Sequence, residues 1–290
     1  MKRLSVSDQI VNVLNIIGCV LVAVITLYPL VYIFSMSISR PEAVISNQVT
    51  LWPVGFSLQA YGIVFKDSGL WLAYWNTLIY TVCGTALSVV LTLMAAYPLS
   101  RKRFFLRKQL SVFFSATMFF SGTLVPMFIL INSLHLYNTR WAIILPAGAA
   151  AWYIIMARTF LAEIPESLYE SARIDGAGEW RILRCIFIPL AKPIIIVLIL
   201  YYAITQWNSY FNALIFLPNQ KLQPLQLYLM KVLIQNGGVS TSGIGKREMS
   251  LISLQLEYVV IVVAVVPILM VYPFLQRYLV KGMLVGAVKE

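Results

Sequence analysis

Acidic and basic side chains that could bind a partner gather in one stretch, residues 170–189, of an otherwise apolar sequence. Glu170, Arg173 and Asp175 lie close together there. Carboxylates and guanidinium groups form charge-assisted hydrogen bonds, which are among the stronger polar contacts. Because residues three apart on a helix are neighbours, the spacing also predicts a weak surface pair between Glu170 and Arg173. The chemistry available in this stretch is recognition of another protein, so we expect a docking element.

The residues around this stretch predict a helix, a break and a second helix. Pro165 followed by Glu166 predicts a helix start, because proline suits the first helical position and an acid is favourable at the positive end of the helix dipole. Gly176 predicts the end of that helix, since glycine takes left-handed backbone angles at low cost. A second amphipathic run should follow, with three aligned apolar residues and a proline that ends it: Trp180, Leu183, Phe187 and Pro189.

Residue types that commonly carry catalysis or hold metals are scarce and far apart. The sole histidine, His135, has no metal-ligand spacing around it, and we expect it to have a surface or packing role. The three cysteines lie in or beside apolar runs, which predicts small core residues and neither disulfides nor metal ligands: Cys19, Cys83 and Cys185. We therefore predict no catalytic residue, no metal site and no cofactor bound by this chain.

A glycine-rich stretch at residues 237–246 has some features of a phosphate-binding loop. That pattern needs glycine where Ser240 stands and serine or threonine where Arg247 follows the lysine, so the match fails and a flexible loop is expected. No acidic or basic residue lies deep inside any apolar run, which argues against coupling to protons or ions. If this chain moves a solute uphill, the energy must come from a partner.

The overall composition is that of a membrane protein. Of the 290 residues, 60% are hydrophobic and 11% are charged, and the mean hydropathy is +0.82. Average soluble domains carry about 25% charged residues. The net charge of +11 is scattered between the apolar runs, which indicates charge that flanks membrane spans and not a nucleic-acid site.

Six apolar runs predict an all-α, polytopic protein with six transmembrane helices, because about 20 apolar residues cross the hydrocarbon core. The first run is too long for the apolar part of a signal peptide and is expected to be an uncleaved anchor. After it, residues 38–72 combine prolines, glycines and aromatic residues, which predicts an interfacial loop with room for a short helix. The spans are expected at residues 11–36, 75–99, 110–130, 141–160, 190–205 and 258–279.

Lysine and arginine are divided unequally between the two sides of the membrane. Placing the N-terminus inside puts most of the 22 basic residues in inner segments, including the cluster at 101–108 and the loop at 161–189. Basic residues concentrate on the cytoplasmic side of membrane proteins. We therefore expect both termini and this loop in the cytoplasm, and residues 206–257 outside.

The stretch at 170–189 resembles the cytoplasmic loop motif of ATP-binding-cassette (ABC) importer permeases. That motif reads Glu-Ala-Ala, three residues, Gly, nine residues, Ile-x-Leu-Pro. This chain has Glu170-Ser-Ala, Gly176 and Ile186-Phe-Ile-Pro189 at the same spacing, with Ser171 in place of alanine and Ile188 in place of leucine. Further stretches are similar to the carbohydrate-uptake, maltose-type branch and its second permease chain: Phe34–Ser37, Asn76-Thr77, Asp175–Ala177, Leu190–Pro193 and Lys281–Lys289.

The resemblance implies the fold of a type I importer permease, with residues 1–290 as one transmembrane domain. It implies that the loop at 161–189 carries a coupling helix, which inserts into a cleft of a cytoplasmic ATPase subunit. Ala172 would be small so that helix and cleft can meet closely. The residues that it assigns to this joint are Glu170, Ser171, Ala172, Asp175, Gly176, Ala177, Ile186 and Pro189. The residues that it assigns to a tail at the ATPase interface are Lys281, Gly282, Gly286 and Lys289.

The same resemblance implies the partners and the location. The chain would lie in the bacterial cytoplasmic membrane, surrounded by lipid. It would pair with a second, homologous permease chain. Two ATPase subunits would bind ATP and Mg, and an extracellular solute-binding protein would deliver an oligosaccharide. The sequence looks most like permeases of Gram-positive systems for oligosaccharides and polysaccharide fragments.

A band of aromatic rings and amides at the end of the fifth span is a candidate sugar path, since rings stack on sugar faces and amides bond hydroxyls. Its members are Tyr202, Gln206, Trp207, Asn208, Tyr210 and Asn212. An interfacial aromatic belt explains the same residues equally well. Nothing in the sequence chooses between an acidic and a neutral glycan.

Two other interpretations remain open. An importer permease for an amino acid or peptide would share the loop motif, although the carbohydrate-type ending argues against it. An ion-coupled carrier or a membrane enzyme would need buried ionisable or metal-spaced residues, which the sequence lacks.

Overall fold

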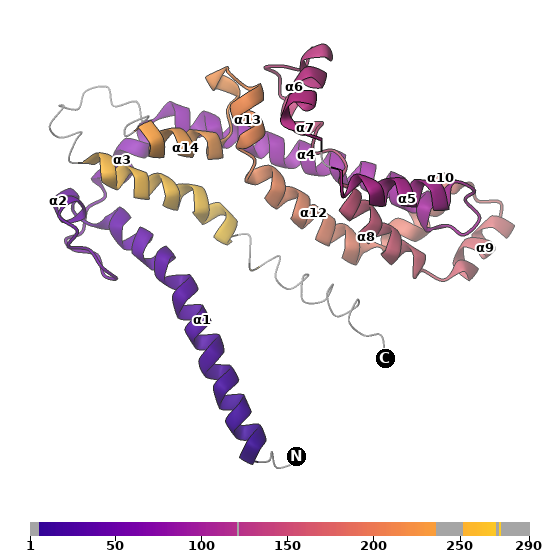
Figure 1. Cartoon of the computed structure of the whole chain (residues 1–290), viewed down its shortest axis with the longest axis horizontal. Helices are drawn as coiled ribbons and strands as arrows, with labels where there is room; N and C mark the ends of the chain where they lie inside the picture. The colour runs from indigo at the N-terminus through magenta and orange to yellow at the C-terminus, as the bar shows by residue number, and fades with distance from the viewer. Residues whose placement is uncertain (1–5, 121, 236–251, 271–272, 274–290) are drawn as a thin grey trace. The chain divides into compact units, whose positions relative to one another are not determined.

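The computed structural model describes residues 6–120, 122–235, 252–270 and 273, which are helical almost throughout (Figure 1). No β-strand occurs within these residues, where Ser39 and Phe56 form an isolated β-bridge. The prediction of an all-α protein is confirmed. The chain divides into two compact units, described separately below: Met1–Leu70 with Leu229–Pro267, and Trp71–Tyr228 with Ile268–Glu290.

Three helices in the described residues are long and apolar enough to cross a membrane, namely Ile10–Ile38, Ser68–Ser100 and Ile252–Met270. The first lies within α1 (Val6–Ile38) and the second is α4 (Ser68–Ser100). They correspond to the predicted first, second and sixth spans. Helix α4 contains no charged residue. It begins at Ser68, seven residues before the predicted start of the second span at residue 75.

The predicted third and fourth spans are not continuous helices. The third is divided into α5 (Arg107–Thr117) and α6 (Leu124–Ser133), and the fourth into α7 (Trp141–Ile144) and α8 (Ala151–Ala162). Pro126 lies in the first turn of α6, where a missing N–H costs no helical hydrogen bond. Pro146, between α7 and α8, lacks the donor that a continuous helix would need.

The predicted fifth span corresponds to α12 (Lys192–Trp207), which follows a bent segment. That segment contains α9 (Glu166–Ile174), α10 (Glu179–Ile182), a π-helical turn η1 (Leu183–Phe187) and α11 (Ile188–Leu190). Glu179–Leu190 and Lys192–Trp207 could form one broken span with a bend of 81°. That pair would be a fourth span, so the count of six stays a prediction.

Short helices occupy the remaining described residues. The segment 38–72 contains α2 (Pro41–Ile45) and α3 (Gln59–Lys66), as expected for a loop with short helical turns and no span. After α12 come α13 (Phe211–Phe216), a 3-10 turn η2 (Gln220–Leu222) and α14 (Leu225–Gln235).

In the first unit, the end of α1 is held by the C-terminal apolar helix. The Gln255 amide donates to the backbone oxygens of Ser37 and Ser39, at 3.0 and 2.6 Å. Met36 and Val44 belong to a small core against which Tyr258 packs. These contacts hold the C-terminal end of α1 against the helix that contains Gln255 and Tyr258.

In the second unit, the beginning of α4 holds the segment that follows α13. The Asn76 amide donates to the backbone oxygens of Lys221 and Gln223, at 2.8 and 3.2 Å, and Arg140 donates to its oxygen at 3.2 Å. The Thr77 hydroxyl accepts from the backbone N–H of Leu225 at 2.7 Å. The Asn76-Thr77 pair noted in the sequence is thus an anchor for backbone that lies far away in the chain.

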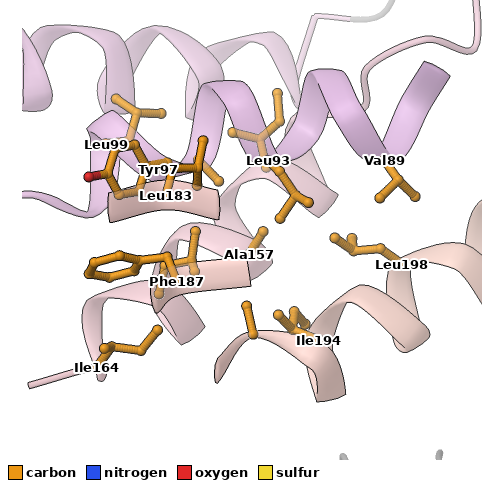
Figure 2. Close-up of a cluster of buried hydrophobic side chains, with 14 of the residues drawn as sticks. Val89, Leu93, Tyr97, Leu99, Ala157, Ile164, Leu183, Phe187, Ile194 and Leu198 are labelled. Carbon is orange, nitrogen blue, oxygen red and sulfur yellow. The ribbon is translucent and has the colours of Figure 1, made fainter. Parts of the chain in front are cut away.

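An extended core lies in the second unit, where α4, α8, α9, η1 and α12 meet. Figure 2 shows side chains of α4, such as Leu93 and Tyr97, facing Phe187 of η1 and Ile194 of α12. The three cysteines were predicted to be small core residues. Cys19, Cys83 and Cys185 are instead all exposed in this chain. A small apolar thiol suits a lipid-facing or subunit-facing surface as well as an interior, so that prediction was wrong about burial.

Candidate functional site

Residues 161–189, from the end of α8 into α11, are called the interspan loop below. Its first helix, α9, begins at Glu166 with Pro165 as the N-cap residue, so the predicted start is confirmed to within one position. The helix ends before Gly176, whose φ of +76° lies in the left-handed region. A β-carbon at Gly176 would meet no atom within 4 Å. Backbone conformation, and not lack of space, therefore requires glycine at the predicted break.

The second half of the interspan loop differs from the prediction at Pro189. This residue lies inside α11 and does not end the helical run, which stops at Ala191 before α12 begins. The π turn η1 precedes it, and a proline without an N–H is tolerated beside such a widened turn.

Trp180 does not share the burial of Leu183 and Phe187, with which the sequence aligned it. Its side chain is 71% exposed, whereas the other two are buried. Trp180 stands in the first turn of α10, beyond the edge of the core. Together with Leu183, Tyr169 and Arg103 it lines a cavity of about 450 Å³.

Glu170 and Arg173 of α9 pair outside their own helix. Glu170 Oε1 lies 3.4 Å from Arg103 Nη2, and Arg173 Nη1 lies 3.6 Å from Glu179 Oε1. The predicted pair between Glu170 and Arg173 is therefore wrong, because each has a partner elsewhere in the described residues. All four side chains are at least half exposed, and such pairs contribute little to stability.

Glu179 joins three helices through two tyrosines. Its carboxylate accepts hydrogen bonds from the Tyr97 hydroxyl of α4 at 2.8 Å and from the Tyr169 hydroxyl of α9 at 2.7 Å. The hydrogen bond to Glu179, together with burial, raises the pKa of Tyr169. A tyrosine is already protonated at neutral pH, so Tyr169 is a donor to Glu179 there.

Most of the predicted coupling residues are accessible on the interspan loop. The exposed ones are Glu170, Ser171, Asp175, Gly176 and Pro189, and the partly exposed ones are Ala177 and Ile186. Ala172 is only 8% exposed and belongs to the chain's own core. Its small side chain fits that core, and its contact with a partner's cleft stays a prediction.

Sequence reasoning missed Ile174, the last residue of α9. Its side chain is 87% exposed, beside Asp175 at the turn. Ile174, with the exposed Asp175 and Gly176 that follow it in the predicted docking loop, is a candidate contact for another protein. The available signal was a lone apolar residue directly before the Asp-Gly break.

Arg101 was also missed, because the sequence places it among basic residues that flank a span. It is buried, unlike its neighbours Lys102 and Arg103. No sequence signal separates it from them. Its contacts come from residues far along the chain and are described below.

The candidate sugar-path residues divide into two groups. Tyr202 and Gln206 are each 2% exposed. The Tyr202 and Thr92 hydroxyls are 2.7 Å apart, and the Tyr202 hydroxyl also accepts from the backbone N–H of Ala150 at 3.3 Å. Tyr202 is thus a packing residue between α4 and α12.

The other members of the band are more accessible. Asn208 and Tyr210 are exposed, and Trp207 and Asn212 are partly exposed. The Trp207 ring meets Tyr74 edge to face at 6.5 Å, while its indole nitrogen is buried without a hydrogen-bond partner. Asn208 and Tyr210 remain candidates for contact with a solute.

Some of the predicted features fall on residues outside the described ranges. The tail residues Lys281, Gly282, Gly286 and Lys289 lie there, as does the glycine-rich stretch at 237–246. His135 is exposed at the surface, as expected. Within the described residues, no group of histidine, cysteine and acidic side chains could hold a metal ion.

Comparison with known proteins gives concordant matches. The family model described as "Binding-protein-dependent transport system inner membrane component" matches residues 88–285. The polygalacturonan/rhamnogalacturonan transport system permease protein YtcP of Bacillus subtilis is 36% identical over 273 residues, which cover 92% of this chain and 94% of that protein.

Solved structures agree with that match. A chain from a bacterial ABC transporter involved in the import of the acidic polysaccharide alginate has a TM-score of 0.87 and 33% identity, over 96% of this chain and 99% of that one. A chain of a bacterial alginate ABC transporter in complex with an alginate pentasaccharide-bound periplasmic protein has a TM-score of 0.53 and 14% identity, over 93% and 96%. The second likeness concerns the fold alone.

Proposed function

Because this chain belongs to the family of binding-protein-dependent transport system inner membrane components, we propose that it is the permease subunit of an ATP-driven importer of oligosaccharides. The observation that carries the proposal is its likeness to a chain of the alginate importer, at a TM-score of 0.87 over nearly the full length of both. A likeness of this extent includes the apolar helices and the interspan loop together. The chain moves the solute and does not itself catalyse a reaction.

In this proposal the interspan loop receives the force of ATP hydrolysis from a cytoplasmic ATPase subunit. The exposed tip formed by Ile174, Asp175 and Gly176 supports this role. Burying an isoleucine side chain stabilises a contact by about 1.5–3 kcal/mol, and Glu170 can add charge-assisted hydrogen bonds at the rim. Two such ATPase subunits bind ATP and Mg, and closure of their dimer changes the access of the spans.

The remaining partners follow from the same function. A second, homologous permease chain completes the path through the membrane, and a solute-binding protein delivers the sugar from outside. We place both termini and the interspan loop in the cytoplasm, in line with the excess of lysine and arginine on that side. The tail at Lys281–Lys289 contacts the ATPase interface.

We further infer that the solute is an acidic oligosaccharide. The Bacillus subtilis relative is named for polygalacturonan and rhamnogalacturonan, and the solved importer is described for the acidic polysaccharide alginate. Galacturonate units carry carboxylates at neutral pH, so both names point to anionic glycans. Asn208 and Tyr210 are the candidates on this chain for contacts with sugar hydroxyls and rings.

The test is ATP hydrolysis by the complete complex in lipid, with its cognate binding protein. Uronate oligosaccharides and neutral oligosaccharides of equal length are compared as ligands. We expect stimulation of hydrolysis by the uronate series only. Equal stimulation by neutral sugars would contradict the acidic preference and leave the importer function standing. A complex with basal ATPase activity that no sugar stimulates would contradict the oligosaccharide assignment.

A further inference from the structure

Arg101 is a buried cation at the junction of α4 and the segment that follows it. Its side chain lies in the cluster 101–108, where Lys102 and Arg103 are exposed, but Arg101 is only 7% exposed. Burying a charge is costly unless hydrogen bonds or charges compensate for it. The contacts of Arg101 should therefore show how its charge is compensated and which elements it connects.

Its hydrogen bonds reach the ends of two helices. Arg101 Nη2 donates to the backbone oxygen of Leu161 at 2.7 Å, in the last turn of α8. Carbonyls of a last helical turn lack partners within the helix, and a cation there also meets the negative end of the dipole. Arg101 Nε donates to the Ser100 hydroxyl at 3.0 Å, at the end of α4.

Its guanidinium group also lies over an aromatic ring of the π turn η1. The central guanidinium carbon is 4.2 Å from the centroid of the Phe187 ring, and 5.9 Å from the centroids of Tyr97 and Tyr169. Nη1 is buried without a hydrogen-bond acceptor. The ring faces are favourable contacts, since a desolvated cation–π contact is stronger than an exposed one, and the carboxylates of Glu166 and Glu179 attract the same cation.

These contacts make one joint of four elements. Phe187 is fully buried and meets the Tyr97 ring edge to face at 5.2 Å. Tyr169 belongs to α9, whose exposed tip carries Ile174. A displacement of α9 and η1 therefore acts on Arg101, and through it on the ends of α4 and α8. Lysine could make only part of this joint, because one ammonium group lacks the planar face and the fork of separate donors.

We propose that Arg101 is a positioning residue for energy coupling: it holds the interspan loop to the ends of α4 and α8, so that movement of the loop moves these helices. This proposal rests on the proposed function, in which an ATPase subunit displaces the loop. Burial lowers the pKa of Arg101, but arginine stays protonated in proteins, so its charge and its donors remain available for these contacts.

The experiment uses the complete importer in lipid with its loaded binding protein. The variants are Arg101→Met, which removes charge and donors but keeps much of the volume, and Arg101→Lys. Lys102→Met is the matched control, since it removes an exposed charge at the next position. The readouts are sugar transported per ATP hydrolysed, stimulation of hydrolysis by the loaded binding protein, recovery of the ATPase subunits and thermal stability.

We expect Arg101→Met to lose about tenfold in sugar transported per ATP, within the usual range of coupling between sites, while the ATPase subunits are recovered in normal amount. Arg101→Lys should be intermediate and Lys102→Met close to the parent protein. A merely structural role would lower stability and recovery and leave the ratio of sugar to ATP unchanged in the assembled fraction. An assembled Arg101→Met complex with a normal ratio overturns the proposal.

Phe187→Leu gives an independent test, because it removes the ring and keeps the hydrogen bonds of Arg101. It should lower the transport ratio in the same direction, and the double variant with Arg101→Met should be no worse than Arg101→Met alone. If Arg101→Met does not assemble, a normal ratio for Phe187→Leu overturns the proposal. Failure of the proposed function looks different, since then even the parent complex responds to no loaded binding protein.

Discussion

Two glycines of the interspan loop differ in backbone conformation and hence in which residues can replace them. Gly176 has a φ of +76°, whereas Gly178 has a φ of −74° and a ψ of 163°. A β-carbon added at either glycine would meet no atom within 4 Å. The pair therefore separates the effect of conformation from the effect of added bulk.

Gly176→Val should uncouple ATP hydrolysis from uptake and leave assembly partly intact. A β-branched residue at positive φ is a strained outlier, so the turn after α9 must change and displace the exposed tip. Gly178→Val, in an extended conformation that valine favours, should transport normally. The measurement is sugar transported per ATP in proteoliposomes. Normal transport by Gly176→Val would contradict the proposed role of this turn in coupling.

Gly84 makes a close approach between α4 and α12. A β-carbon there would collide with Nε2 of Gln206 and lie 2.7 Å from its Cδ, so the buried Gln206 side chain would have to shift. Gly84→Ala should lower the free energy of unfolding by about 1–3 kcal/mol, as overpacking of a core does. Gly18→Ala on α1, where a β-carbon meets nothing within 4 Å, is the control.

Thermal unfolding of the purified protein in detergent measures this difference. Combining Gly84→Ala with Gln206→Ala should restore most of the lost stability, because the second change removes the atoms in conflict. Equal stability of Gly84→Ala and Gly18→Ala would mean that α4 and α12 do not pack closely at this point.

At the scale of elements, α9 has one face in the chain's own core and one accessible tip. Ala172 packs inward with Tyr169, and Ile174 points into the surroundings. Ile174→Asn should weaken the retention of the ATPase subunits without lowering the stability of the permease. Ala172→Leu should destabilise the permease itself by about 1–3 kcal/mol, because it adds three carbons to a packed core.

The two effects are read from the amount of ATPase that co-purifies and from the unfolding temperature of the permease. A stable Ala172→Leu protein that loses only its ATPase would place Ala172 at the partner joint after all. An Ile174→Asn complex that retains its ATPase as firmly as the parent would exclude the tip from that joint.

At the scale of the whole molecule, the membrane orientation can be tested by labelling. Single cysteines are placed at two exposed positions, as Ser167→Cys on the interspan loop and Gln220→Cys in η2, after the native Cys19, Cys83 and Cys185 are replaced. With the loop in the cytoplasm, a membrane-impermeant maleimide should label Gln220→Cys in intact cells. Ser167→Cys should react only after permeabilisation, and the opposite pattern would reverse the proposed topology.

Local features of the sequence were sufficient for the type of fold and for the position of the interspan loop. Long apolar runs predict α1 and α4 because crossing lipid depends on length and composition alone. The start of α9 at Pro165 and the break at Gly176 also depend on a few adjacent residues. The interruptions of the third and fourth spans were less evident, since an apolar run with Pro126 or Pro146 is compatible with either a kinked or a divided helix.

Only the tertiary structure decided which of these side chains face inward. Arg101 is buried because Leu161 and Phe187, far along the chain, supply its acceptor and its ring. Ala172 and Tyr202 turn into the core and Ile174 turns out of it, although their residue types suggested other roles. Composition and spacing describe residues that are close in the sequence. Burial depends on residues that are close in space, and these come together only when the helices pack against one another.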